Sequence, residues 1–374
     1  MPAAETWCFR CASHWMNSLT KLFCPCLKAS FDEQLTFIRE IFSLHRKLRS
    51  NPRPAGRARR ACQPETIHRL LLRRKLVPKI SNFFGGGSSV QSYDATVQHY
   101  QSDDTVHDTV SASQLGLHRY QGIGVTVSSG TMEKLADATW ANRVAKSAIP
   151  SGAGNQRAEI IKSGGESWAR MHLADQKYSG GGSTGALKRA QKFQGGNCAV
   201  HAAVAAAALQ SRGVNYPVNR VHMQLPDGDS HEFVLLGDRR ESGDRNTVVV
   251  DPWPTHPSAC TLDQAVLHDA TKGAHHVVAQ FLDNSSYRSE IYRSSIGSAD
   301  VQRLSKIEVL GTAELEKKLG KAGFSGVRTQ DLVNHALNDT KFGQFDVRVA
   351  TDPSTYYKDD SGSGWQTFDP VLRR

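Results

Sequence analysis

The sequence is poor in aromatic residues and has no apolar run long enough to cross a bilayer. Phe, Trp and Tyr make up 8% of the 374 residues, whereas 31 residues are glycine. The longest apolar run, residues 199–209, is about half the ~20 residues that a transmembrane helix needs, and it contains His201. The first 30 residues lack the apolar segment of a secretory signal, and the proline after Met1 excludes N-myristoylation. We expect one sizeable core accompanied by long irregular segments.

The cysteine pattern does not predict a disulfide framework. The chain has seven cysteines, an odd number, and four of them (Cys8, Cys11, Cys24 and Cys26) precede residue 27. Reduced thiols fit a cytosolic working environment. A zinc site is not expected because no histidine set or second CxxC accompanies these cysteines, and no cofactor is indicated. Cys24 and Cys26 remain candidates for lipidation by S-acylation, against the alternative of a plain disordered terminus.

Positive charge is concentrated in one segment. The chain carries a net charge of +10, yet residues 46–79 contain twelve Lys or Arg and one acidic residue, which gives +11 in that segment alone. Such a segment is typical of an arm for an anionic membrane surface or a targeting receptor, or of a solvated linker. It lacks interleaved aromatic residues and a recognisable module, so a nucleic-acid partner is not expected.

The chain divides by composition into four parts. We expect a Cys-rich and basic targeting segment over 1–84, a weakly ordered linker with short helices over 85–186, a catalytic domain over 187–345 and a C-terminal tail over 346–374. Apolar periodicity predicts helices over residues 30–49, 67–76, 131–146, 166–176, 312–321 and 329–338. The polar stretch 90–130 is expected to be poorly ordered, glycine-rich breaks fall at 85–89 and 180–185, and residues 277–282 read as a strand.

A cysteine stands at the start of a strongly apolar helix. Cys198 follows Gly195, Gly196 and Asn197 and precedes an alanine-rich run that stops at Gly213. The unpaired amides at a helix N-terminus carry partial positive charge, which favours a thiolate and can bind an oxyanion. Side-chain donors for the oxyanion could come from Gln194, Asn197 or Gln191, and the sequence does not choose among them.

A histidine and an aspartate lie at the ends of two strands that read as a hairpin. HEFVLLG begins with His231, and TVVVDPW ends its valine run at Asp251 before a proline. The two positions are symmetric about Glu241, in the polar turn between the strands. An antiparallel hairpin centred there places His231 directly opposite Asp251, at a distance from which a carboxylate can bond an imidazole. A slip of one residue would spoil this pairing.

Each of these residues also has an ordinary structural interpretation. A small cysteine in an alanine-rich helix is often part of the core, and Asp-Pro is a common turn signal. Other reactive residues are present as well, namely His201 one turn after Cys198, and further away His222, Cys260, His275 and His276. The catalytic interpretation depends on the fact that each of the three reactive residues lies at the end of a predicted helix or strand.

The order helix-Cys, strand-His, strand-Asp resembles the papain-like and transglutaminase-like cysteine enzyme superfamily. The segments that carry the resemblance are GGNC, HEFVLLG and VVVDPW, and their compact spacing is nearest to the deamidase and protease domains of bacterial toxins and effectors. The resemblance implies an α+β fold in which an apolar helix with the cysteine packs on an antiparallel sheet with the histidine and aspartate. It also implies a nucleophile at Cys198, a general base and acid at His231 and an orienting carboxylate at Asp251. The tryptophan that usually adjoins the nucleophile of animal transglutaminases is absent, so amine transfer is less secure than hydrolysis.

These expectations define a primary function and an alternative. The primary one is a thiol-dependent acyl-transfer enzyme acting on a protein amide, as a cysteine protease, a glutamine deamidase or a transglutaminase-like enzyme. The flexible N-terminal half before a compact core resembles secreted bacterial effectors, which implies delivery into a host cell cytosol, with membrane association through residues 46–79 as an option and a cytoplasmic location otherwise. The alternative is a non-catalytic adaptor that docks to membranes or partners through the basic N-terminal segment.

Overall fold

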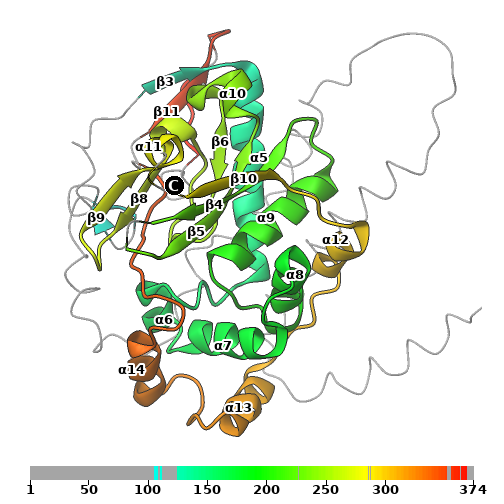
Figure 1. Cartoon of the computed structure of the whole chain (residues 1–374), viewed down its shortest axis with the longest axis vertical. Helices are drawn as coiled ribbons and strands as arrows, with labels where there is room; N and C mark the ends of the chain where they lie inside the picture. The colour runs from blue at the N-terminus through cyan, green and yellow to red at the C-terminus, as the bar shows by residue number, and fades with distance from the viewer. Residues whose placement is uncertain are drawn as a thin grey trace, which may run out of the picture. The chain divides into compact units, whose positions relative to one another are not determined.

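The computed structural model describes residues 105–107, 110–111, 124–225, 227–284, 286, 288–351, 355–362 and 364–368. The predictions for Cys24, Cys26, the basic segment 46–79, the helices at 30–49 and 67–76 and the break at 85–89 lie outside these residues. The fold class predicted from the sequence, α+β, is confirmed for the described part, in which helices pack on an antiparallel sheet (Figure 1).

The central element is a five-stranded antiparallel sheet with the strand order β10-β4-β5-β6-β7. Its strands are β4 (Val218–Gln224), β5 (Ser230–Leu236), β6 (Val248–Val250), β7 (Cys260–Thr261) and β10 (Ser289–Arg293). Side chains alternate between the two faces. Phe233 and Leu235 belong to one buried cluster, and Val234 and Leu236 belong to another. The sheet is therefore covered on both sides.

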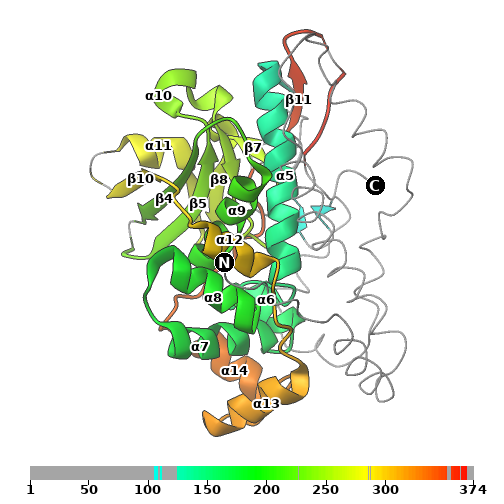
Figure 2. The ribbon, with the colours of Figure 1, turned by 90° about the vertical axis from the view of Figure 1, so that its right-hand side faces the viewer.

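Two helices cover the Val234 face of the sheet, α5 (Ser129–Ala148) and α9 (Cys198–Arg212). Figure 2 shows α5 as a long helix running beside α9 and the sheet. The contact is built from alanines such as Ala138 and Ala141 on α5 and Ala202 and Ala205 on α9, all of them fully buried. Small side chains let the two backbones approach closely, which explains why the alanine run of the sequence is buried on nearly every side.

The Phe233 face is covered by the segment from η4 to α11. This segment contains η4 (Leu262–Gln264), the hairpin β8 (Val266–Asp269) and β9 (Ala274–Val277), and helix α11 (Val278–Asp283). The predicted strand over 277–282 is therefore wrong, because β9 ends at Val277 and a helix follows. Val278, Ala279 and Phe281 are the buried residues of that helix. Their spacing suits one side of a helical turn, which a short apolar run cannot distinguish from a strand.

A group of helices packs around Trp168, which is fully buried, at one end of the molecule (Figures 1 and 2). The cluster draws on α6 (Arg157–Lys162), α7 (Glu166–Tyr178), α8 (Gly182–Phe193), α13 (Thr312–Lys321) and α14 (Gln330–Asn338), while α12 (Ser298–Leu304) lies against α8 and α9. The helices predicted near 131–146, 166–176, 312–321 and 329–338 are confirmed. The predicted break at 180–185 is only partly right, because α8 begins at Gly182.

Packing contacts cross both of the predicted domain boundaries, at residues 187 and 346. Helix α5 precedes the first boundary and shares a buried cluster with α9 and β6. After the second boundary, β11 (Tyr356–Asp359) pairs in parallel with β3 (Gly124–Val127), and Tyr357 of β11 is buried. Strand β3 lies inside the stretch 90–130 that was expected to be poorly ordered. Composition cannot reveal such long-range packing. In the described part of the chain the remaining elements are β1 (Thr105–His107), β2 (Val110–Ser111), α10 (Arg239–Ser242) and η3 (Asp244–Asn246), and no helix there is long and apolar enough to span a membrane.

Candidate active site

The helix that carries the candidate nucleophile begins at Cys198, as the sequence predicts. Gly195 and Gly196 lead into it through tightly packed space. A Cβ at Gly195 would lie 2.5 Å from the Cβ of Arg170, and one at Gly196 would collide with the side chain of Val200. Asn197 is the N-cap residue, but no described side chain caps the helix. The first amides of α9 therefore lack a side-chain cap, although the N–H of Val200 donates to the carbonyl of Asn197.

His231 and Asp251 form a direct, buried hydrogen bond. The imidazole Nε2 lies 2.6 Å from Asp251 Oδ2, and the two residues are 2% and 5% exposed. His231 is the second residue of β5, and Asp251 comes directly after β6. The Asp251 carboxylate also accepts a hydrogen bond from the backbone N–H of Trp253 at 3.1 Å. The Asp251 carboxylate is thus fixed by a backbone N–H two residues further along the chain, and it in turn orients the imidazole of His231.

The register of the hairpin differs from the predicted one. The ladder pairs Val234 with Val250 and Leu236 with Val248, which is symmetric about residue 242 and not about Glu241. His231 therefore does not lie directly opposite Asp251, and the two side chains meet diagonally. Because the shift in pairing amounts to two residues along one strand, both side chains remain on the same face of the sheet. A diagonal pair lies within reach of a histidine ring, and the hydrogen bond forms in spite of the error.

Cys198 lies close to His231. Its Sγ is 4.0 Å from the carbonyl oxygen of Ser230, the residue before His231, and the thiol contributes to the raised pKa of the imidazole. Since Nε2 is bonded to Asp251, the nitrogen left for the thiol is Nδ1, which is buried and has no conventional hydrogen-bond partner. The three residues therefore stand in the order thiol, imidazole, carboxylate.

The electrostatics of the pair favour a charged imidazole. Burial by itself lowers the pKa of His231, but the charge and hydrogen bond of Asp251, with a smaller contribution from Cys198, outweigh burial and raise the pKa to about 10. A histidine that stays protonated near neutral pH stabilises negative charge on a neighbouring sulfur and can later donate its proton.

Two aromatic rings contact the imidazole, and a third packs against one of them. Phe233 stacks on it at a centroid distance of 5.5 Å, and Trp253 lies against it at 4.7 Å. Phe345 packs edge-on against Trp253, whose Nε1 donates to Asn155 Oδ1 at 2.9 Å. The sequence analysis missed Asn155 and Phe345 because each lies about 100 residues away along the chain from its partner. The position of Trp253 in VVVDPW was the only local signal.

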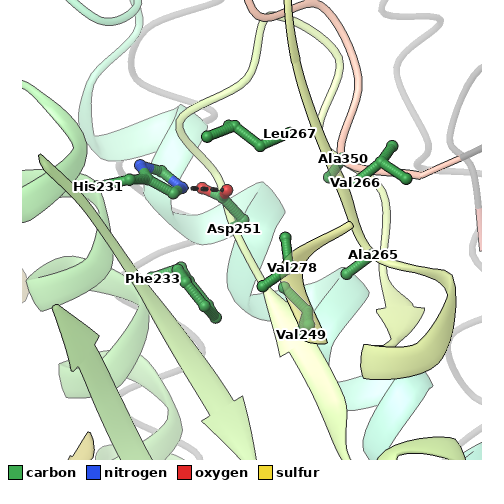
Figure 3. A pocket seen from close by; sticks show the side chains of 9 residues that line it. All are labelled: His231, Phe233, Val249, Asp251, Ala265, Val266, Leu267, Val278 and Ala350. Carbon is green, nitrogen blue, oxygen red and sulfur yellow. Dashed lines mark hydrogen bonds and ion pairs between the residues drawn. The ribbon is translucent and has the colours of Figure 1, made fainter. Parts of the chain in front are cut away.

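A small apolar pocket borders the same pair on the Asp251 side. Figure 3 shows His231 and Asp251 joined across it, with aliphatic side chains around them. The remaining lining residues are Phe233, Val249, Ala265, Val266, Leu267, Val278 and Ala350. Cys198 does not line this pocket, so the pocket does not give access to the thiol. The thiol side of the imidazole is closed as well, because Cys198 is only 6% exposed.

The side chain of Gln194, a predicted oxyanion donor, has hydrogen-bond partners elsewhere. Its backbone is left-handed, with a φ of 49°, and its side chain is buried and turned away into a network of its own. Nε2 donates to the carbonyls of Ala190, Gln191 and Glu308, and Oε1 accepts from Leu310 N. Gln191 is likewise engaged, since it donates to Lys306 O. Asn197 differs from both because its Oδ1 is buried without a partner, next to Cys198.

The other reactive residues lie in different settings. Burial raises the pKa of Cys260, whose thiol faces the carbonyl of Ala350. His222 pairs with Glu232 at 3.6 Å, and His275 and His276 lie on β9. Within the described ranges, no group of three His, Cys, Asp or Glu side chains could hold a metal ion.

Comparisons with known proteins do not assign the chain to a family. The sequence matches no protein-family model, and searches of curated proteins and of solved structures found no similar protein. The functional argument therefore depends on the geometry of Cys198, His231 and Asp251.

Proposed function

We propose that the protein is a thiol-dependent acyl-transfer enzyme that acts on protein amides, with Cys198 as nucleophile, His231 as general base and acid, and Asp251 as the group that orients His231. One observation carries the proposal: His231 bonds Asp251 through Nε2 at 2.6 Å, and the Cys198 thiol lies 4.0 Å from the carbonyl oxygen of the residue before His231. Each of the three residues was picked out separately as an element end in the sequence. Their convergence in one buried cluster is what a nucleophile, a base and an orienting group require.

In the first half of the reaction, the acyl group of the substrate amide is transferred to Cys198. Because the His231 imidazole stays charged near neutral pH, it already holds the proton of the thiol, and the Cys198 thiolate attacks the carbonyl carbon of the substrate amide. The oxygen of the tetrahedral intermediate takes up the negative charge, facing the uncapped amides at the start of α9. The imidazolium then donates its proton to the leaving nitrogen as the carbon–nitrogen bond breaks, which leaves a thioester on Cys198 and releases ammonia or an amine.

In the second half, water or an amine resolves the thioester. His231 takes a proton from the attacking group, which adds to the thioester carbonyl, and the carbon–sulfur bond breaks to restore the thiol. Attack by water completes peptide cleavage if the substrate amide is a peptide bond, and glutamine deamidation if it is a side chain. Attack by an amine gives transglutamination. A papain- or transglutaminase-like core, a protein substrate and delivery by a bacterium into a host cell remain part of this proposal, together with membrane association through residues 46–79.

The burial of the site is compatible with the alternative function as well. Cys198, His231 and Asp251 are 6%, 2% and 5% exposed, which suits an inert core cysteine in an adaptor protein as well as an enzyme that opens on binding substrate. In the adaptor interpretation, the bond between His231 and Asp251 would be a structural ion pair. The two functions therefore differ in one property, the reactivity of the Cys198 thiol.

Cysteine mapping separates the two functions. The full chain is treated with a limiting amount of iodoacetamide at neutral pH, and the alkylated cysteines are identified by mass spectrometry. We expect Cys198 to react at least tenfold faster than Cys260, which is similarly buried and serves as the internal control. His231→Ala should abolish that preference. Equal labelling of the two cysteines, or a preference that survives His231→Ala, contradicts the enzymatic function. Comparison of host-cell proteins exposed to the wild type and to Cys198→Ala would then distinguish deamidation from cleavage.

A further inference from the structure

A second histidine on the nucleophile helix is buried and takes no part in the reaction proposed above. His201 lies one turn after Cys198 on α9 and is fully buried. Its Nδ1 is 2.9 Å from the carbonyl oxygen of Asn197, the N-cap residue. A carbonyl oxygen can only accept, so Nδ1 carries the proton and His201 donates.

The contact acts on the peptide unit that precedes Cys198. The Asn197 carbonyl also accepts the backbone N–H groups of Val200 and His201, both at 3.1 Å. Three donors thus hold this oxygen toward the body of the helix. In a planar trans peptide, the N–H of the next residue points the opposite way. The Cys198 N–H is therefore directed out of the N-terminal end of the helix.

We propose that His201 is a positioning residue that fixes the Asn197–Cys198 peptide so that the Cys198 amide serves as the oxyanion donor. The inference rests on the proposed function of Cys198. The nucleophile and the donor then belong to one residue, and its orientation depends on a side chain one turn away.

The surroundings of His201 keep it a neutral donor. Burial, together with the nearby positive charge of Lys146, lowers the pKa of His201 to about 3. Its second nitrogen, Nε2, is buried without a hydrogen-bond partner. A buried polar atom without a partner is unfavourable, so a residue with a purely structural role at this position would be served better by an apolar side chain. The hydrogen bond that Nδ1 donates to the Asn197 carbonyl explains why a histidine, and not an apolar residue, stands at this position.

Two reactions of the same thiol test the inference. Iodoacetamide alkylates a thiolate by direct displacement and forms no oxyanion. p-Nitrophenyl acetate acylates it through a tetrahedral oxyanion and releases p-nitrophenolate as the carbon–oxygen bond breaks. The variants are His201→Leu, which removes the donor, and His201→Asn, whose amide can replace Nδ1 as donor. Both rates are measured on the full chain with the label mapped to Cys198.

We expect His201→Leu to lower the ratio of acylation to alkylation about tenfold, and His201→Asn to restore it to within about twofold of the wild type. The figure is below the ~10²–10³-fold loss on deleting an oxyanion donor, because two backbone amides still hold the Asn197 carbonyl. A ratio that stays constant in His201→Leu, with both rates unchanged or falling together, overturns the inference and leaves the proposed function intact. A wild-type protein that is not acylated at Cys198 overturns both.

Discussion

The pair of His231 and Asp251 predicts a specific dependence of stability on pH, provided that the thiol is first removed. Transfer of a proton from Cys198 to His231 would leave the number of bound protons unchanged and hide the effect. The comparison is therefore made between Cys198→Ala and the double variant Cys198→Ala/Asp251→Asn. Asparagine keeps the shape and one hydrogen bond of Asp251 but removes the negative charge that raises the pKa of His231.

The sign and size of the effect follow from that pKa. A histidine whose pKa rises from 6.5 to about 10 on folding adds stability that is complete below pH 6.5 and is lost as the pH rises toward 10. The slope in this window is about 1.4 kcal/mol for each pH unit, so the full contribution is at most about 5 kcal/mol. Breaking a buried ion pair by removing one partner costs ~3–5 kcal/mol, which agrees with that upper value.

Urea unfolding at several pH values measures the difference. Far-UV circular dichroism follows the transition, because the six tryptophans of the chain would mix the signal of Trp253 with those of other regions. We expect the difference in free energy of unfolding between the two variants to be largest at pH 6 and to shrink steadily up to pH 9.5. Other titrating groups affect both variants equally and cancel in the difference.

A difference that does not change with pH would refute this reasoning. It would mean that His231 is neutral in the folded protein at pH 6, so that Asp251 holds it by a hydrogen bond alone. A positively charged imidazole beside Cys198 would then be excluded, and the proposed proton donor would be lost with it.

Two further substitutions separate structural residues from catalytic ones. Trp253→Phe removes the donor of the 2.9 Å bond to Asn155 and should lower the free energy of unfolding in urea by about 1–3 kcal/mol, because a buried acceptor loses its partner. If the bond is the cause, Asn155→Ala should lower the unfolding free energy much less in Trp253→Phe than in the wild type. Equal losses in the two backgrounds would contradict it. Gln194→Leu should lower the unfolding free energy by a similar ~1–3 kcal/mol through its lost bonds to Glu308 and Leu310, while the acylation rate of Cys198 stays within about twofold of the wild type; a loss of acylation alone would restore Gln194 as an oxyanion donor.

The predicted contact between His231 and Asp251 is present although the predicted strand register is wrong, because the error in register leaves both residues on the same face of the sheet. The predicted hairpin was centred on Glu241 as if a simple turn joined the strands. The connection instead contains α10 and η3, and the ladder is centred on residue 242. Strand alternation depends only on whether a shift is odd or even, so the face of His231 and Asp251 was right although their alignment was not. Tertiary packing sets the alignment, and no local signal encodes it.

The elements that support the site could not be predicted in the same way. Cys198, His231 and Asp251 lie within about 55 residues of one another, on three elements with clear local signals. Asn155 and Phe345 reach the site from segments about 100 residues away on either side. Their positions depend on how the loop before α6 meets the strand-like stretch after Gly343, where Phe345 N donates to Asn155 O at 3.1 Å. Neither residue lies in a pattern that local propensity could interpret.

Although the chain has few aromatic residues, several of them lie at this site and restrict the imidazole of His231. Among the described residues, Phe233, Trp253 and Phe345 form a continuous set of ring contacts that begins at the imidazole of His231. Such pairs contribute ~0.5–1.5 kcal/mol each beyond the area they bury, and they restrict how a ring can rotate. With Asp251 bonded to Nε2 and aromatic rings against the imidazole, rotation of the ring would break several contacts at once. In the proposed reaction, proton transfer between Cys198 and the substrate would therefore proceed through Nδ1 of a fixed ring, and the substrate would reach the thiol, which is 6% exposed, through movement of the residues that cover it.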